Sequence, residues 1–121
     1  MTDSKSLGDK GEELAVSFLA GNGFRILHRN WCWGKNEIDV IAEKDEFIVF
    51  VEVKTRTGDF FDDPVNAINR AKQRSIILAA EGYMKRWGND KECRFDVVTV
   101  IIKNNDSKIE HIPDAFYPTL R

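Results

Sequence analysis

Three acids and one lysine lie in two neighbouring apolar stretches of the chain, and together they could hold a metal ion. They are Glu37, Asp39, Glu52 and Lys54. The first two belong to residues 36–42 and the other two to residues 47–54, and both stretches are rich in residues typical of strands. Because side chains alternate along a strand, each pair projects from one face of its own strand.

The four polar residues 43–46 are few enough to join the two stretches as a hairpin. A tight turn centred on Lys44 and Asp45 would place Glu37 opposite Glu52. All four functional candidates would then share one side of the sheet, with Asp39 and Glu52 as diagonal neighbours about 7–8 Å apart at the backbone. Two carboxylates at that separation can bracket a divalent cation.

Mg²⁺, or Mn²⁺ in its place, suits such a site. Magnesium takes oxygen ligands and is often held by one or two carboxylates together with the phosphate oxygens of a substrate. Without a cation, the two acids would repel each other and lose solvation. Lys54 would stand beside the metal, where it could orient or deprotonate an attacking water or neutralise charge in a phosphoryl-transfer transition state.

A structural interpretation of the same residues stays open. Glu52 and Lys54 could mark the point where the strand emerges into solvent, with Lys54 making an ordinary cross-strand ion pair. Clusters of interacting charges are often structural. Spacing alone does not choose between the two interpretations.

Length and composition limit the remaining possibilities. With 121 residues, 42% hydrophobic and 31% charged, the sequence predicts a single globular domain over residues 1–121. No apolar run approaches the length of a membrane span and the N-terminus lacks the pattern of a signal peptide, so we expect a cytoplasmic protein without a membrane partner. The two cysteines, Cys32 and Cys93, fit neither a disulfide framework nor a zinc site and are expected to be packed thiols.

Charge is distributed unevenly along the chain. The formal net charge is −2, which lacks the basic field that drives non-specific nucleic-acid binding. Residues 37–52 hold six acids against one base, whereas residues 54–94 hold nine bases against six acids. An acidic centre beside a mildly basic flank suits a cation-assisted site for an anionic substrate.

Hydrophobic patterns predict two helices and up to five strands. The first helix has an apolar period from Leu7 to Leu19, and the second begins at Asp62-Asp63-Pro64 and ends at Gly88. The strands are expected at residues 24–31, 36–42, 47–54, 94–102 and 108–112, the last ended by Pro113. Residues 47–51 are apolar on both faces, which indicates a central strand. This order implies an α/β fold with a mixed sheet flanked by helices.

Short blocks between Gly8 and about Val100 match one family of proteins. They are Gly8-x-x-Gly11-Glu12-x-x-Ala15-x-x-Phe18-Leu19-x-x-x-Gly23-Phe24, Asn30, Glu37-Ile38-Asp39-Val40-Ile41, Phe50-Val51-Glu52-Val53-Lys54-x-Arg56, Pro64, Lys72 and Arg94-Phe95-Asp96-Val97-Val98. The chain resembles the YraN-like family of small bacterial proteins, predicted nucleases of the restriction-endonuclease-like, or PD-(D/E)xK, superfamily. Archaeal Holliday-junction resolvases belong to the same superfamily. The resemblance implies a core of αβββαβ.

The resemblance also implies roles for particular residues. Asp39 falls on the first metal-binding acid of the superfamily, and Glu52 and Lys54 fall on its (D/E)xK pair. The Val53 carbonyl would be a further metal ligand and Glu12 an auxiliary acid of the active site. A competing interpretation of Glu12 is a first-turn carboxylate favoured by the helix dipole.

Several positions carry open alternatives. Asn36 stands where the family usually has Gly, and asparagine tolerates left-handed backbone, so we expect the local turn to survive. Lys72 interrupts the apolar stripe between Ile68 and Ile76, where it would either contact phosphate or snorkel to solvent. Arg56 is a further candidate for binding nucleic acid, and Trp31-Cys32-Trp33 could stack on bases or pack in the core.

The sequence thus leads to one main hypothesis, a Mg²⁺-dependent endonuclease acting on DNA, with branched or flapped structures among its candidate substrates. Its main rival is a nucleic-acid-binding module whose nuclease-like site does not cut, and a purely structural adaptor is a third possibility. A homodimer is compatible with each.

Overall fold

The computed structural model describes residues 4–58, 68–88 and 90–118 of the chain. Seven elements follow one another: α1 (Ser4–Gly21), β1 (Arg25–Trp33), β2 (Asn36–Lys44), β3 (Phe47–Thr57), α2 (Arg70–Trp87), β4 (Glu92–Lys103) and β5 (Asp106–Phe116). The α/β class and the order of elements predicted from the sequence are confirmed.

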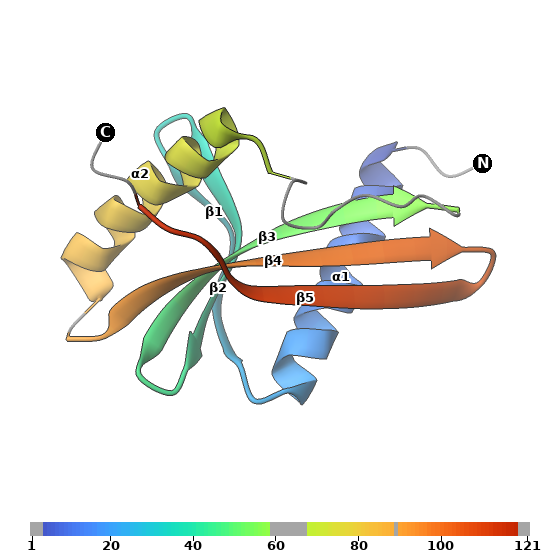
Figure 1. Cartoon of the computed structure of the whole chain (residues 1–121), viewed down its shortest axis with the longest axis horizontal. Helices are drawn as coiled ribbons and strands as arrows, with labels where there is room; N and C mark the ends of the chain where they lie inside the picture. The colour runs from blue at the N-terminus through green and yellow to red at the C-terminus, as the bar shows by residue number, and fades with distance from the viewer. Residues whose placement is uncertain (1–3, 59–67, 89, 119–121) are drawn as a thin grey trace.

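The five strands form one mixed sheet in the order β1-β2-β3-β4-β5. Among these strands of the described residues only β3 and β4 run parallel, and α2 lies in the connection between them, as is usual for a parallel pair. The two helices lie on opposite faces of the sheet (Figure 1).

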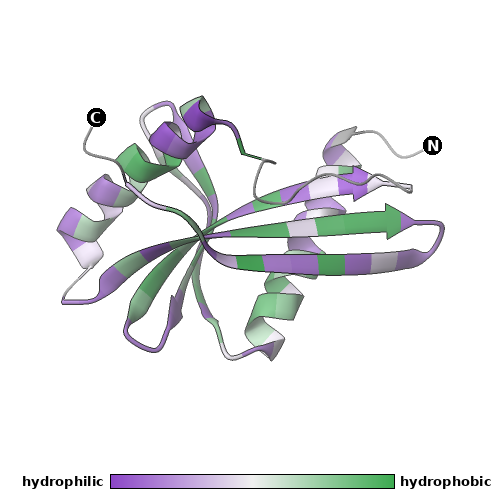
Figure 2. Ribbon diagram, in the orientation of Figure 1, coloured by the Kyte–Doolittle hydropathy of each residue, from purple (hydrophilic) through white to green (hydrophobic). Residues whose placement is uncertain are grey.

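Two hydrophobic cores hold the helices against the sheet. Ala15 and Leu19 of α1 pack with Val49 and Val51, whereas residues of α2 pack with Phe50 on the other face. The central position predicted for β3 is confirmed, because residues 49–51 are fully buried in the middle of the sheet. The long apolar run of β4 beside the mixed pattern of edge strand β5 is visible in Figure 2.

β2 changes face in its middle. Ile41 packs on the side of α2 and Val40 on the side of α1, as alternation requires, but Ile38 also packs on the side of α2. One residue is therefore out of alternation between Ile38 and Val40, and that residue is Asp39. The expectation that Glu37 and Asp39 follow the regular alternation of β2 is wrong for this reason.

The hairpin register differs from the predicted one. The turn between β2 and β3 is Asp45-Glu46, with Asp45 at φ 54°, so Val40 pairs with Val51 and Ile41 with Phe50. The turn predicted at Lys44 and Asp45 is wrong by one position, which shifts each partner by two residues and conserves the face. Asp tolerates left-handed backbone, and this explains why the chain turns there.

Two predicted ends of elements are corrected. α2 begins at Arg70 after the N-cap Asn69, whose side chain accepts a hydrogen bond from the Lys72 amide (2.8 Å). The start predicted at Asp62-Asp63-Pro64 lies outside the described residues, and Ile68 precedes the helix. Pro113 does not end β5, which continues to Phe116, because an edge strand tolerates a missing N–H.

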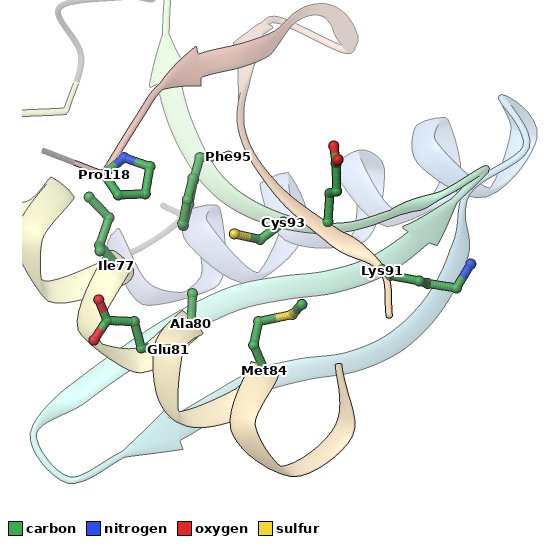
Figure 3. Close-up of a pocket in the computed structure, with 9 residues that line it drawn as sticks. Ile77, Ala80, Glu81, Met84, Lys91, Cys93, Phe95 and Pro118 are labelled. Carbon is green, nitrogen blue, oxygen red and sulfur yellow. The ribbon is translucent and has the colours of Figure 1, made fainter. Parts of the chain in front are cut away.

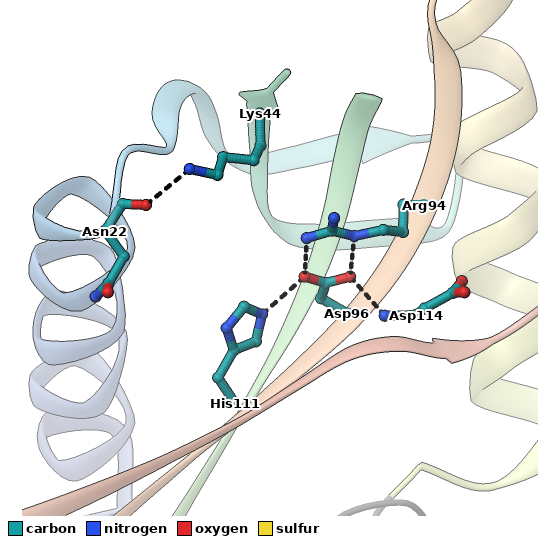
Figure 4. Close-up of polar contacts among 6 residues, drawn as sticks. All are labelled: Asn22, Lys44, Arg94, Asp96, His111 and Asp114. Atoms are coloured by element: carbon teal, nitrogen blue, oxygen red, sulfur yellow. Dashed lines mark hydrogen bonds and ion pairs between the residues drawn. The ribbon is translucent and has the colours of Figure 1, made fainter. Parts of the chain in front are cut away.

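A buried ionic cluster ties β4 to β5. Asp96 is fully buried and accepts two hydrogen bonds from Arg94 (2.9 Å each) and one from the Asp114 amide (3.0 Å). His111 Nε2 lies 2.7 Å from the same carboxylate (Figure 4). Burial alone raises the pKa of Asp96, but the hydrogen bonds from His111, Arg94 and the Asp114 amide outweigh it and bring this pKa below its ordinary value.

Two further expectations concern the cysteines and membrane-spanning helices. Cys32 and Cys93 are both unpaired, as predicted, but they are exposed and the expectation of packed thiols is wrong. Within the described residues, neither helix is long and apolar enough to cross a membrane.

Candidate metal-dependent site between β2 and β3

The predicted acids Asp39 and Glu52 come together where β2 and β3 diverge. The last pair of this ladder is Val40 with Val51, so each acid lies one residue beyond it on its own strand. Asp39 Oδ2 accepts a hydrogen bond from the Val53 amide (2.9 Å). The irregularity of β2 thus turns the Asp39 carboxylate towards the β3 backbone, directly beside Glu52.

Glu52 is the more deeply buried member of the pair and the one with an unsatisfied oxygen. Only 5% of its surface is exposed, and its Oε1 atom is buried without a hydrogen-bond partner among the described residues. Burial first, then the charge of Asp39 and a hydrogen bond to it, raise the pKa of Glu52 to about 8, against opposing effects of Lys72 and Lys54. A buried acid with an unpartnered oxygen is costly unless a cation or proton joins it.

Lys72 and Lys54 supply positive charge on the side of α2. The Nζ atom of Lys72 lies 3.7 Å from Glu52 Oε2. Lys54 follows Glu52 by two residues on the same face of β3 and acts on it electrostatically. Lys72 thus reaches from the first turn of α2 to Glu52, while 37% of its side chain stays exposed.

Glu12 approaches the site from the opposite face of the sheet. Burial, followed by the charge of Asp39, raises the pKa of Glu12, with Arg29 acting against them and Glu37 adding to them. The alternative of a first-turn carboxylate is wrong, because α1 begins at Ser4 and has no acid in its first turn. Glu12 is held near the site because Gly11 packs so closely on Thr55 of β3 that a Cβ would overlap Thr55 Oγ1.

Two further predicted positions lie at the margins of the site. Arg56 follows Lys54 on β3, is half-buried, and donates a hydrogen bond to the Thr55 carbonyl (3.3 Å). Asn36 does not take a left-handed conformation, which in this turn falls on Gly34 (φ 61°). Its side chain instead accepts a hydrogen bond from Ser75 of α2 (2.6 Å), a contact that no sequence signal indicated.

The donor set suits a hard cation with an incomplete protein shell. Asp39 and Glu52 present carboxylate oxygens, and the orphaned Glu52 Oε1 is an acceptor in need of a positive partner. In the described part of the chain, no group of three or more His, Cys, Asp or Glu side chains is placed to hold a metal ion. Magnesium commonly retains several waters and substrate oxygens, so a pair of carboxylates fits it better than it fits zinc or calcium.

A separate cavity of about 490 Å³ lies away from these acids. It opens between the second half of α2 and the start of β4, and it is lined mainly by apolar side chains together with Cys93 and Glu81 (Figure 3). Cys93 lies next to Glu92, which pairs with Phe47 at the far end of β3, five residues before Glu52. The cavity is thus not part of the carboxylate site.

Comparison with known proteins shows the family of this chain. Residues 11–100 match the model of the uncharacterised protein family UPF0102. A UPF0102 protein of Bacteroides thetaiotaomicron is 42% identical over 120 residues, covering 99% of each chain. One of Parabacteroides distasonis is 40% identical over the whole of both chains, and one of Flavobacterium psychrophilum is 41% identical over 97% of this chain and 98% of its own. The chain belongs to the UPF0102 family.

Proposed function

We propose that this protein is a metal-dependent endonuclease that hydrolyses phosphodiester bonds in DNA, with branched DNA among its substrates. The proposal combines the carboxylate site with the resemblance of the chain to the restriction-endonuclease-like superfamily. The single observation that carries it is the buried Glu52 carboxyl beside Asp39, with its Oε1 atom unpartnered among the described residues. A carboxylate that served only a structural ion pair would have its oxygens satisfied.

Each residue would have a distinct task. Asp39 and Glu52 would hold Mg²⁺ or Mn²⁺, together with the Val53 carbonyl, and the Val53 amide fixes the Asp39 carboxylate. When bound, the cation would polarise the phosphate and lower the pKa of an attacking water. Lys54 would orient or deprotonate that water, and Lys72 would share charge between Glu52 and a substrate phosphate.

Cleavage of a panel of linear, nicked, flapped and four-way DNA in Mg²⁺ and Mn²⁺ tests this proposal. We expect Asp39→Ala, Glu52→Ala and Lys54→Ala each to lower the cleavage rate by orders of magnitude, because each removes a charge that acts on the transition state. Glu43→Ala is the matched control. Glu43 is also an acid of β2, but it pairs with Arg25 and Lys91 at the other end of the strand.

The control should cleave at the wild-type rate, and circular dichroism should show that all four variants are folded. Equal cleavage by the wild type and the three site variants would refute the assignment. Loss of cleavage in Glu43→Ala to the same degree would show that the effect comes from stability or net charge and not from the site.

A second candidate is a module that binds nucleic acid without cutting it. The observation in its favour is the ion pair between Lys72 and Glu52, which already gives the buried acid a cationic neighbour. This candidate predicts that the wild type binds the DNA panel but leaves every substrate intact in both metals. The same panel therefore distinguishes the two functions.

A further inference from the structure

An aromatic surface lies on the edge strand β1, beside the candidate site. Trp33 is 42% exposed, although Trp31 lies nearly parallel to it, with ring centroids 6.0 Å apart and an angle of 14° between the planes. Behind it, Gly82 of α2 has no room for a side chain, since a Cβ there would lie 2.6 Å from two atoms of the Trp33 ring. The ring is thus held from two sides and still presents surface to solvent.

This arrangement differs from ordinary core packing. A tryptophan that only filled the core would be mostly buried, and a loose surface tryptophan would not touch both a second ring and a helix backbone. A ring fixed in advance loses little freedom when a flat partner stacks on it. We call Trp33, with Trp31 beside it and Gly82 behind it, the platform.

The charge of α2, the helix that packs behind the platform, favours a polyanion over an apolar protein partner. The chain as a whole has a net charge of −2, but α2 contains five basic residues and one acid, a net charge of +4. The guanidinium of Arg86 lies 5.2 Å from the ring centroid of Trp87, at the end of α2 next to Trp31. Lysine, which α2 carries at positions 72 and 85, is depleted in interface cores between proteins, whereas aromatic rings flanked by basic side chains suit nucleic acid.

The platform is joined to the carboxylate site by an unbroken set of contacts. Trp33 pairs with Asn36 across the β1–β2 ladder, and Asn36 bonds to Ser75, one helical turn after Lys72. Asn36 precedes Asp39 by three residues, which is about 10 Å along a strand. That span corresponds to roughly three stacked nucleotides at 3.4 Å each.

We propose that Trp33 stacks on an unpaired base of a DNA substrate, a few nucleotides from the bond at the carboxylate site. This inference rests on the proposed function, and it specifies the substrate class as DNA with a single-stranded segment beside the cleaved bond. Inside a fully paired duplex, neighbouring base pairs cover both faces of each base. Bases of any sequence can stack, so the preference would be for structure.

Binding measured by fluorescence anisotropy in chelator tests the platform without cleavage. The probes are a labelled duplex with a single-stranded flap and a fully paired duplex of the same sequence. We expect Trp33→Leu to weaken binding of the flapped DNA by about 5- to 100-fold, the range of one base–aromatic stack. Binding of the paired duplex should not change, and Trp33→Phe should retain most of the affinity for the flap.

Tyr117→Leu is the matched control, because Tyr117 is an exposed aromatic residue (64%) that follows β5, at the opposite edge of the sheet. It should bind both probes like the wild type. Equal losses for flapped and paired DNA, or no loss in Trp33→Leu, would overturn the proposal. A change from dimer to monomer in Trp33→Leu on size-exclusion chromatography would also overturn it, because the surface would then be an interface between copies.

Photo-crosslinking of the wild-type protein avoids any dependence on variant folding. A flap carrying 5-iodouracil should form its adduct on the peptide that contains Trp33, and an adduct found elsewhere would contradict the proposal. Failure of the proposed function is distinguishable from failure of this inference. Flap binding through Trp33 without cleavage in any metal would refute only the nuclease, and unchanged flap binding by an active Trp33→Leu enzyme would refute only the platform.

Discussion

Neutralising Glu52 and neutralising Asp39 should have different effects on the stability of the protein. A simple argument from like charges would expect neutralisation of either acid to relieve repulsion. The structure distinguishes them, because Asp39 accepts a hydrogen bond from the Val53 amide while Glu52 Oε1 is buried and unpartnered in the described structure. Removing the charge of Asp39 therefore breaks a favourable contact. Relief of the repulsion between the two acids is expected instead when Glu52 is neutralised.

We expect Glu52→Gln to change how stability depends on pH. The pKa of Glu52 is raised from 4.5 to about 8 in the folded protein, so the folded state holds its proton more tightly than the unfolded chain. The wild type should lose up to about 1.4 kcal/mol of unfolding free energy per pH unit from this group as pH rises from 4.5 towards 8. Glu52→Gln should match the wild type below pH 4.5 and exceed it above pH 8.

Urea unfolding of both proteins in chelator across this range measures the difference. Glu43→Gln is again the control, since the hydrogen bond from Lys91 chiefly lowers the pKa of Glu43 and its neutralisation should give no gain at high pH. Parallel profiles for the wild type and Glu52→Gln would show that the buried acid does not titrate in this window.

At the scale of elements, the contact of α1 with β3 positions Glu12 and Thr55. We expect Gly11→Ala to lower the free energy of unfolding by about 1–3 kcal/mol, because the added methyl overlaps Thr55 Oγ1 and must push the helix from the sheet. Gly8→Ala, in the same helix with open space around it, should instead raise stability by roughly 0.5–1 kcal/mol. Thermal or chemical unfolding of both variants compares them.

The relative stability of Gly11→Ala and Gly8→Ala can contradict this prediction. If Gly11→Ala is as stable as Gly8→Ala, α1 is not fixed by this close contact, and the approach of Glu12 to Asp39 loses its structural cause. A loss of stability in both variants would instead show that α1 does not tolerate alanine at either glycine position, whatever the space around it.

Sequence patterns predicted which elements form but not how they join. The apolar run of residues 47–51 determined a central strand, since only burial on both faces suits it. The turn among the polar residues 43–46 could not be located in this way, because no glycine marks it, and the left-handed Asp45 decides the register. The start of α2 at Arg70 depends on the Asn69 cap, a signal present in the sequence but outweighed by the proline at position 64.

The candidate site was partly predictable for similar reasons. Proximity of Asp39 and Glu52 followed from strand pairing and survived the error in register, because the observed ladder brings Asp39 from a diagonal position to one opposite Glu52. The reach of Asp39 to the Val53 amide depends on the irregularity of β2 after Ile38, which has no local sequence signal. The contact of Lys72 with Glu52 depends on how a distant helix docks, and the sequence indicated only that Lys72 interrupts an apolar stripe.

At the scale of the whole molecule, a bound cation should stabilise the fold. We expect millimolar Mn²⁺ or Mg²⁺ to raise the unfolding free energy by about 1–3 kcal/mol at concentrations well above the dissociation constant. Glu52→Gln and Asp39→Asn should lose most of this gain, because each removes one of two carboxylate ligands. Thermal melts of these proteins with metal and with chelator test the site without a substrate.

Glu43→Gln should keep the full response to metal, since its ion pairs with Arg25 and Lys91 lie elsewhere on β2. If neither metal changes the melting temperature of the wild type, the carboxylate pair has only a structural role. A response retained in every variant would indicate that the cations bind to some other part of the protein.

The parallel pairing of β3 with β4 bears on how this protein folds. Phe47 on β3 pairs with Glu92 on β4, far along the chain, whereas the antiparallel pairs join consecutive strands through turns such as Asp45-Glu46. Loop-closure entropy favours the local hairpins first and the parallel seam later. We therefore expect Asp39 and Glu52 to meet while still hydrated and Lys72 to join them only when α2 docks. On this order, we expect the acidic pair to lose its hydration in the last stage of folding.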